Sequence, residues 1–179
     1  MSEGRDQTTE VEEDAVDRII KGWSRQVPGF DPGPLQVFGR LNRVARLLDN
    51  NLRAFFQEHG LGIADYDLMA ALFRVGPPYM AKPSSLARSS LLTSAGITLR
   101  VDRMVKTGMV ERIHDLDDRR SVYVQLTDQG LDLVSRIALL NRERQRRMLD
   151  SLTNAEAAVL EDVFRKLERR LLRPGWPDE

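Results

Sequence analysis

The stretch Ser94–Gly130, SAGITLRVDRMVKTGMVERIHDLDDRRSVYVQLTDQG, changes its hydrophobic period partway along. Apolar residues recur at helical spacing as far as Thr107, and then alternate with polar residues in the segments MVERIH and SVYVQL. Gly108, a predicted C-cap, separates the helical segment from the first alternating segment, and the charged turn DLDDRR joins the two alternating segments. Thr127 is the predicted N-cap of the helix that follows. A helix followed by a hairpin with a cationic tip is typical of a DNA-reading helix and its wing. The pattern therefore favours a nucleic-acid-binding regulator over an enzyme.

Composition limits the other classes of protein. The chain has 179 residues, enough for one sizeable domain with helical extensions, and is 41% hydrophobic and 30% charged. No apolar run approaches the roughly 18 residues of a membrane span, and the N-terminus lacks a basic-then-apolar signal, so we expect a cytoplasmic protein with no membrane partner. There is no cysteine, and His59 and His114 are the only histidines. We therefore expect neither a disulfide, nor a metal site, nor a cofactor.

The charge is balanced overall but unevenly distributed. The chain has 27 basic and 27 acidic residues. Residues 1–20 contain seven acids against Arg5 and Arg18, whereas residues 82–120 contain eight Lys or Arg against five acids. Because local field matters more than net charge for phosphate contact, a basic central region is compatible with DNA binding. The neutral total favours a specific regulator over a general nucleic-acid coat.

The pattern along the chain predicts a mainly α fold with a small β-hairpin wing, that is, a winged helix-turn-helix between long N- and C-terminal dimerisation helices. Helices are expected over about 12–26, 35–59, 64–74, 83–89, 94–107, 127–150 and 153–172, with the wing over 109–126. The predicted organisation is a disordered acidic tail (1–10), N-terminal helices (11–60), the DNA-binding domain (61–126), C-terminal dimerisation helices (127–173) and a tail (174–179).

The flanking helices carry more apolar surface than so small a core needs. A symmetric homodimer is the common way to cover such a surface. The candidate interface residues are Leu139, Leu140, Met148, Leu149, Leu152, Leu160, Val163, Phe164, Leu167, Leu171 and Leu172.

The predicted recognition helix and wing supply the candidate DNA contacts. Short hydroxyl and apolar side chains near the helix N-terminus permit close approach to phosphates and thymine methyl groups, and a later arginine can reach guanine or phosphate. Two arginines at the hairpin tip, beside Asp117 and Asp118, suit the negative potential of the minor groove. The alternatives are an ordinary amphipathic surface helix, with Ile97, Val101, Met104 and Val105 facing the core, and a solvated charged turn. The expected DNA-binding residues are Ser94, Ala95, Thr98, Leu99, Arg103, Arg119 and Arg120.

This ordered set of segments resembles the MarR family of transcriptional regulators, over about Leu35 to Leu172. The resemblance is carried by Leu86-Ala87, by VDRMVKTGMVER, by DLDDRRSVYVQLT and by Asp128-Gln129-Gly130. It implies a homodimer whose N- and C-terminal helices interlock. It also implies one recognition helix and one wing per subunit on a pseudo-palindromic operator in double-stranded DNA.

Four positions are similar to the urate-responsive branch of that family. Members of that branch have an extra N-terminal helix with a Trp, an Asp early in the helix before the helix-turn-helix, and two Arg flanking the recognition-helix end. The matching residues are Trp23, Asp67, Arg100 and Arg112. The resemblance implies a ligand-binding site for a small anion such as urate, whose binding would release a repressor from DNA. The alternatives are packing for Trp23, helix-terminus placement for Asp67, phosphate contact for Arg100 and a surface ion pair for Arg112.

Two other functions stand beside this prediction. One is a MarR-type regulator of a different effector, such as a tricarboxylate or a phenolic acid. The other is a helical protein-interaction module with no affinity for DNA. An enzyme is not expected, because the sequence has no Gly-rich phosphate loop, nucleophile motif or ligand cluster.

Overall fold

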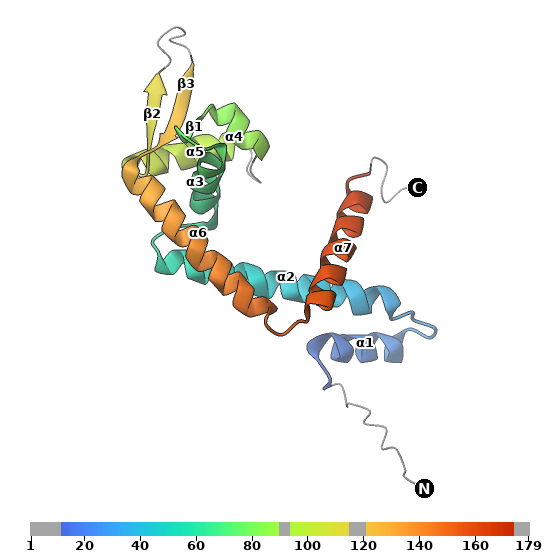
Figure 1. Cartoon of the computed structure of the whole chain (residues 1–179). Helices are drawn as coiled ribbons and strands as arrows, with labels where there is room; N and C mark the ends of the chain where they lie inside the picture. The colour runs from blue at the N-terminus through green and yellow to red at the C-terminus, as the bar shows by residue number, and fades with distance from the viewer. Residues whose placement is uncertain (1–11, 90–93, 115–120, 174–179) are drawn as a thin grey trace. The chain divides into compact units, whose positions relative to one another are not determined.

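The computed structural model describes residues 12–89, 94–114 and 121–173 (Figure 1). The chain divides into two compact units, Met1–Ile63 and Ala64–Glu179. The structure is mainly helical with one small antiparallel sheet, which confirms the predicted fold class. Among the described residues, no helix combines the length and apolarity that crossing a membrane requires.

The first unit contains two helices, α1 (Ala15–Gln26) and α2 (Gly33–Glu58). Asp14 caps α1: its side chain accepts hydrogen bonds from the backbone N–H groups of Val16 and Asp17, and the Asp17 side chain accepts from the Asp14 N–H. This capping box fixes the start of α1 three residues after the predicted one. Helix α2 begins before the predicted Leu35, because Pro34 suits the first turn of a helix.

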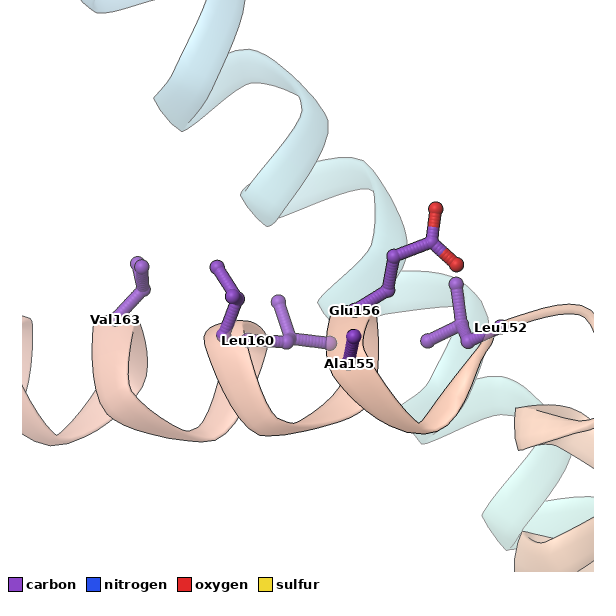
Figure 2. A pocket seen from close by; sticks show the side chains of 6 residues that line it. Leu152, Ala155, Glu156, Leu160 and Val163 are labelled. Carbon is purple, nitrogen blue, oxygen red and sulfur yellow. The ribbon is translucent and has the colours of Figure 1, made fainter.

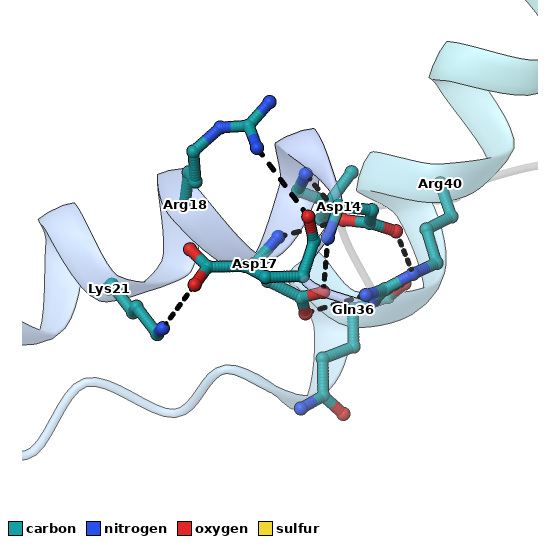
Figure 3. Close-up of polar contacts among 8 residues, drawn as sticks. Asp14, Asp17, Arg18, Lys21, Gln36 and Arg40 are labelled. Carbon is teal, nitrogen blue, oxygen red and sulfur yellow. Dashed lines mark hydrogen bonds and ion pairs between the residues drawn. The ribbon is translucent and has the colours of Figure 1, made fainter. Parts of the chain in front are cut away.

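Arg40 of α2 ties the two helices together. Its Nε lies 2.9 Å from Oδ2 of Asp14, and its Nη2 lies 2.6 Å from Oδ1 of Asp17 (Figure 3). Val16 of α1 is buried against Gly39, where a Cβ would come within 2.8 Å of the valine Cγ1. The close approach and the shared guanidinium together dock α1 on α2 specifically.

The second unit contains a helical core and the sheet. Its helices are α3 (Ile63–Val75), α4 (Pro83–Ser89), α5 (Ser94–Lys106), α6 (Asp128–Leu149) and α7 (Asn154–Leu171). Its strands are β1 (Met80–Ala81), β2 (Val110–His114) and β3 (Val122–Leu126), in the order β1-β3-β2.

The predicted hairpin is present, and the structure adds a third strand. Strands β2 and β3 pair antiparallel from Val110 opposite Leu126 to His114 opposite Val122. Strand β1 pairs with the other edge of β3, Met80 opposite Gln125. The sequence analysis missed β1, because a two-residue strand is too short to show a period-2 pattern.

The core of the second unit is built from residues of α3, α4, α5, α6 and the sheet. Helix α5 buries Ile97, Val101 and Met104, which recur at helical spacing, as predicted. Helix α3 is buried on most sides and supplies the largest share of the core. The other buried apolar residues of this unit are Leu68, Met69, Ala70, Ala71, Leu72, Leu86, Val110, Val124, Leu126, Val134 and Ile137.

A tight junction joins the wing to α6. Gly108 follows α5 with a φ of 73°, as its predicted role at the helix end requires. Thr127 caps α6, as predicted, accepting from the Gly130 N–H and donating to the Gly108 carbonyl. Gly130 approaches the residue before β2 so closely that an added Cβ would overlap the carbonyl oxygen of Met109. The α6 start is therefore fixed against the sheet by backbone contact.

Helix α7 differs from the other helices of this unit in having no buried residue. Thr153 and Glu156 form a capping box at its start. Its apolar residues line one side, where Leu152, Ala155, Glu156, Val159, Leu160 and Val163 surround an open hollow of about 430 Å³ (Figure 2). The capping explains why α7 forms, and nothing among the described residues of its unit covers its apolar side.

Candidate nucleic-acid interface

Helix α5 has one buried face and one exposed face. Ile97 and Val101 are each 1% exposed, whereas Leu99 is 65% exposed and Thr98 is exposed too. The Arg103 side chain is about half exposed. The described candidates for DNA contact therefore lie away from the core. Ser94 and Ala95 open α5, but their side chains lie outside the described ones.

Two arginines of α5 converge on one buried carboxylate of α3. Nη1 of Arg100 lies 3.4 Å from Oδ1 of Asp65, and Nη1 of Arg103 lies 3.4 Å from Oδ2 of the same residue. Asp65 is fully buried, and it is the one charged residue in that state among the residues described. A buried carboxylate needs a cation beside it, so these ion pairs fix the position of α5 relative to α3.

The sequence analysis chose Asp67 as the acid of this region and missed Asp65. Asp67 is half-buried, and its burial raises the pKa of its carboxyl, an effect that the Arg74 charge opposes. The structure pairs Arg100 with Asp65. The signal was available: Leu68, Met69 and Leu72 lie three, four and seven residues after Asp65, so the helical period places Asp65 on the core face of α3.

Arg112 of β2 pairs with Asp102 of α5. The Arg112 Nη2 and the Asp102 Oδ1 are 2.5 Å apart, and both side chains are more than 40% exposed. This is the surface ion pair that the sequence analysis gave as the alternative for Arg112. It joins the first wing strand to the recognition helix. Arg100 and Arg112 thus lie on contacting elements, each beside its own carboxylate.

Trp23 lies in the first unit, whereas the other three predicted ligand residues lie in the second. Its side chain is 51% exposed and stacks on Phe30, with ring centroids 5.8 Å apart and planes 16° apart. The indole is therefore packed on Phe30 while about half of its surface stays exposed.

A cation that was not among the predicted DNA contacts lies beside the described part of the wing. Lys82 Nζ lies 3.2 Å from Oγ of Ser121 and 5.2 Å from the centroid of the Tyr123 ring. Only the pairing of β1 with β3 brings Lys82 beside the wing, and a strand of two residues gave no sequence signal for that contact. Arg119 and Arg120 lie outside the described residues.

The two histidines have ordinary surroundings. His59 caps the end of α2, with its Nδ1 2.7 Å from the Phe55 carbonyl oxygen. His114 is exposed at the end of β2. In the described ranges, no three His, Cys, Asp or Glu side chains gather as they would around a metal ion.

Comparison with known proteins gives consistent matches. The model of the MarR family matches residues 64–122. The HTH-type transcriptional regulator PecS of Dickeya dadantii is 32% identical over 157 residues, which cover 88% of this chain and 95% of that protein. The HTH-type transcriptional regulator PapX of Escherichia coli is 23% identical over 154 residues, covering 86% of this chain and 93% of that protein.

Two solved structures from Streptomyces coelicolor share the fold. The MarR family transcriptional regulator AbsC matches with a TM-score of 0.71 at 22% identity, covering 81% of this chain and 98% of that one. The MarR family regulator Sco3205, solved in complex with DNA, matches with a TM-score of 0.70 at 24% identity, covering 83% and 94%. These likenesses establish the winged helix-turn-helix architecture.

Proposed function

Because the chain belongs to the MarR family of DNA-binding transcriptional regulators, we propose that it is a homodimeric repressor released from a pseudo-palindromic operator by a small anion such as urate. The observation that carries the proposal is the two-sided α5. Its apolar side is buried, while Thr98, Leu99 and Arg103 remain exposed.

The exposed side of α5 suits the major groove. Thr98 can donate to or accept from a base edge, Leu99 can contact a thymine methyl group, and Arg103 can reach guanine or phosphate. Ser94 and Ala95 precede them at the helix N-terminus, where backbone N–H groups favour phosphate. We assign Arg119 and Arg120 of the wing to the adjacent minor groove, with Lys82 adding positive charge beside β3.

A second copy of the chain is the proposed partner of α7. Val159 is 63% exposed, Val163 40% and Phe164 44%, although all three are large apolar side chains. An exposed apolar side of this size is costly in water and marks a protein interface. A two-fold dimer would also place two α5 helices on half-sites about 34 Å apart, as a pseudo-palindrome demands.

The anion would act where α5 meets the wing. Arg100 and Arg112 are each partly exposed and each already neutralised by a carboxylate, so a bound anion competes with Asp65 and Asp102 for them. Of the other two residues that the family resemblance assigns to the ligand, Trp23 offers an aromatic face to a planar anion, and Asp67 carries a charge that the anion would repel. Loosening the ion pairs that hold α5 would shift each recognition helix, and a two-site operator tolerates little change in spacing.

A gel-shift titration on the DNA upstream of the chain's own gene tests the proposal. Salt-dependent binding that urate relieves is the expected result, and citrate and salicylate serve as a tricarboxylate and a phenolic acid for comparison. Binding that ignores urate but yields to one of these keeps the regulator and replaces its ligand. Absence of any salt-dependent DNA affinity overturns the proposal in favour of a protein-interaction module.

The ligand residues are tested one at a time. Trp23→Ala, Asp67→Ala and Arg112→Ala are each expected to weaken the response to urate. The matched control is Arg53→Ala, which removes an exposed arginine paired with Asp49 on α2 and should leave the response unchanged. A full response in Trp23→Ala or Asp67→Ala would remove that residue from the proposed site.

A further inference from the structure

Asp65 joins one residue from each of the two proposed sites. It pairs through one carboxylate oxygen with Arg100, which belongs to the proposed anion site, and through the other with Arg103, which belongs to the proposed DNA surface. The two arginines are three residues apart on α5 and therefore share one side of that helix. A single carboxylate thus contacts one arginine of the proposed anion site and one arginine of the proposed DNA surface.

Asp65 is more deeply buried than the two arginines that share its carboxylate. The residue is fully buried, whereas the side chains of Arg100 and Arg103 are 32% and 52% exposed. A carboxylate in that position cannot turn to water, so its charge is stabilised by the protein groups that reach it, and these two arginines are among them. A guanidinium has five N–H donors, so each arginine can also offer donors to an anion arriving from solvent.

We infer that Asp65 is the positioning residue that couples anion binding at Arg100 to DNA binding at Arg103. An anion that draws Arg100 toward itself leaves Asp65 to be neutralised by Arg103. Arg103 is then held closer to α3 and withdrawn from the DNA, so affinity for the operator falls. The inference rests on the proposed function, and it assigns the coupling to a residue outside the predicted anion site.

The test uses Asp65→Asn in the full-length chain, which keeps the side-chain shape and removes the charge. Each subunit then has one more arginine charge that no carboxylate neutralises, so the slope of log binding constant against log salt should steepen by about 2 per dimer. The urate-induced loss of affinity should shrink from at least about 10-fold in the parent chain to less than about 3-fold. A tenfold change in affinity corresponds to a coupling free energy of about 1.4 kcal/mol.

The charge-matched control is Asp132→Asn. Asp132 is an exposed acid on α6 of the same unit, so this variant makes the same change in net charge without touching α5. Its salt slope and urate response should match the parent chain. A purely structural role for Asp65 would lower the melting temperature and the DNA affinity of Asp65→Asn without steepening the slope. A folded Asp65→Asn with the parental urate response overturns the inference, whatever its slope.

A second variant covers the case in which Asp65→Asn fails to fold. Arg103→Ala removes a half-exposed side chain and leaves Asp65 paired with Arg100. Its DNA affinity should be lower. Because the arginine that Asp65 is proposed to withdraw is then absent, urate should change the remaining affinity by less than about 3-fold, where tenfold corresponds to about 1.4 kcal/mol. Urate binding itself, followed by calorimetry, should persist. A parental fold-response to urate in Arg103→Ala overturns the inference.

The parent chain separates this inference from the proposed function. Failure of the unsubstituted protein to bind DNA overturns both. DNA binding that urate does not affect removes the proposed ligand and the coupling with it. DNA binding that urate relieves equally in the parent chain and in Asp65→Asn keeps the proposed function and overturns the role of Asp65 alone.

Discussion

Helices α5 and α7 are both amphipathic, yet they satisfy their apolar sides differently. In α5 the apolar side is buried, with Ile97 and Val101 each 1% exposed. In α7 the corresponding residues face solvent, with Val159 63% and Phe164 44% exposed. Within one chain the apolar side of α5 is packed, whereas none of the described residues of the same unit packs on the apolar side of α7.

The difference indicates which part of the function a single chain can carry. The packed unit, by which we mean α3 to α6 with the sheet, has its own core and a fixed junction at the start of α6. Helix α7 has caps and ion pairs at its surface but no tertiary packing within its unit, and packing of an amphipathic face supplies most of the stability of a helix in a protein. We therefore assign reading of one half-site to the packed unit and assembly of two half-sites to α7.

The largest expected effect comes from breaking the proposed α7 interface. The double substitution Leu160→Asp/Phe164→Asp places charges on the apolar side, so a homodimer should dissociate and operator affinity should fall by about 1,000-fold or more, toward non-specific binding. Sedimentation analysis and gel shift measure the two effects. Arg169→Ala, on the opposite side of α7, is the control. A double variant that remains dimeric would place the interface elsewhere.

The next effect tests whether the packed unit depends on its own backbone contacts. Gly130→Ala would place a Cβ on the carbonyl oxygen of Met109, so α6 or β2 must shift. Overpacking of this kind should cost about 3 kcal/mol and lower the melting temperature by roughly 10 °C. Gly22→Ala, at an α1 position where nothing lies within 4 Å of the added Cβ, should instead stabilise by about 0.5–1 kcal/mol. Equal melting temperatures for the two variants would contradict the close approach at Gly130.

Sequence reasoning predicted the elements whose pattern is long enough to recognise. The helical period of α5, the alternation in β2 and β3, and the caps at Gly108 and Thr127 are all local signals, and the structure confirms them. Strand β1 was missed because its pairing with β3 is a long-range contact of two residues. Elements with local sequence signals could therefore be predicted, whereas a strand that forms only through long-range pairing could not.

The candidate site was predicted unevenly for a related reason. The exposure of Thr98 and Leu99 followed from the period of α5, because their neighbours Ile97 and Val101 were expected in the core. The partners of the arginines did not follow, because an ion pair between helices depends on how the helices cross. The buried position of Asp65 was inferable from the period of α3, but its contact with Arg100 and Arg103 needed the tertiary structure.

A smaller effect is expected from Asp67, a half-buried acid within the packed unit. Burial raises the pKa of its carboxyl above the ordinary value of 3.8. Its contribution to stability is therefore fully present below pH 3.8 and is lost as pH rises through the raised pKa, when the buried group must ionise. Asp67→Asn should melt roughly 2–4 °C higher than the parent chain at pH 7, and the gap should close toward pH 4. A variant that melts lower at pH 7 would contradict this.

The smallest effect is expected from Glu143 on α6, an exposed acid that forms ion pairs with Arg146 and Arg147. Hydrogen bonds from Arg146 and Arg147 lower the pKa of its carboxyl from 4.5 to about 2. Its contribution is therefore present above pH 4.5 and is lost as pH falls toward 2, the opposite sense to Asp67. Because solvent screens the exposed ion pairs, Glu143→Gln should lower the melting temperature at pH 7 by at most about 2 °C. The difference should vanish at pH 2 and diminish in 1 M salt, where screening is strong. A larger, salt-independent loss would mean that this part of α6 is covered in the assembled protein, and would extend the proposed interface from α7 onto α6.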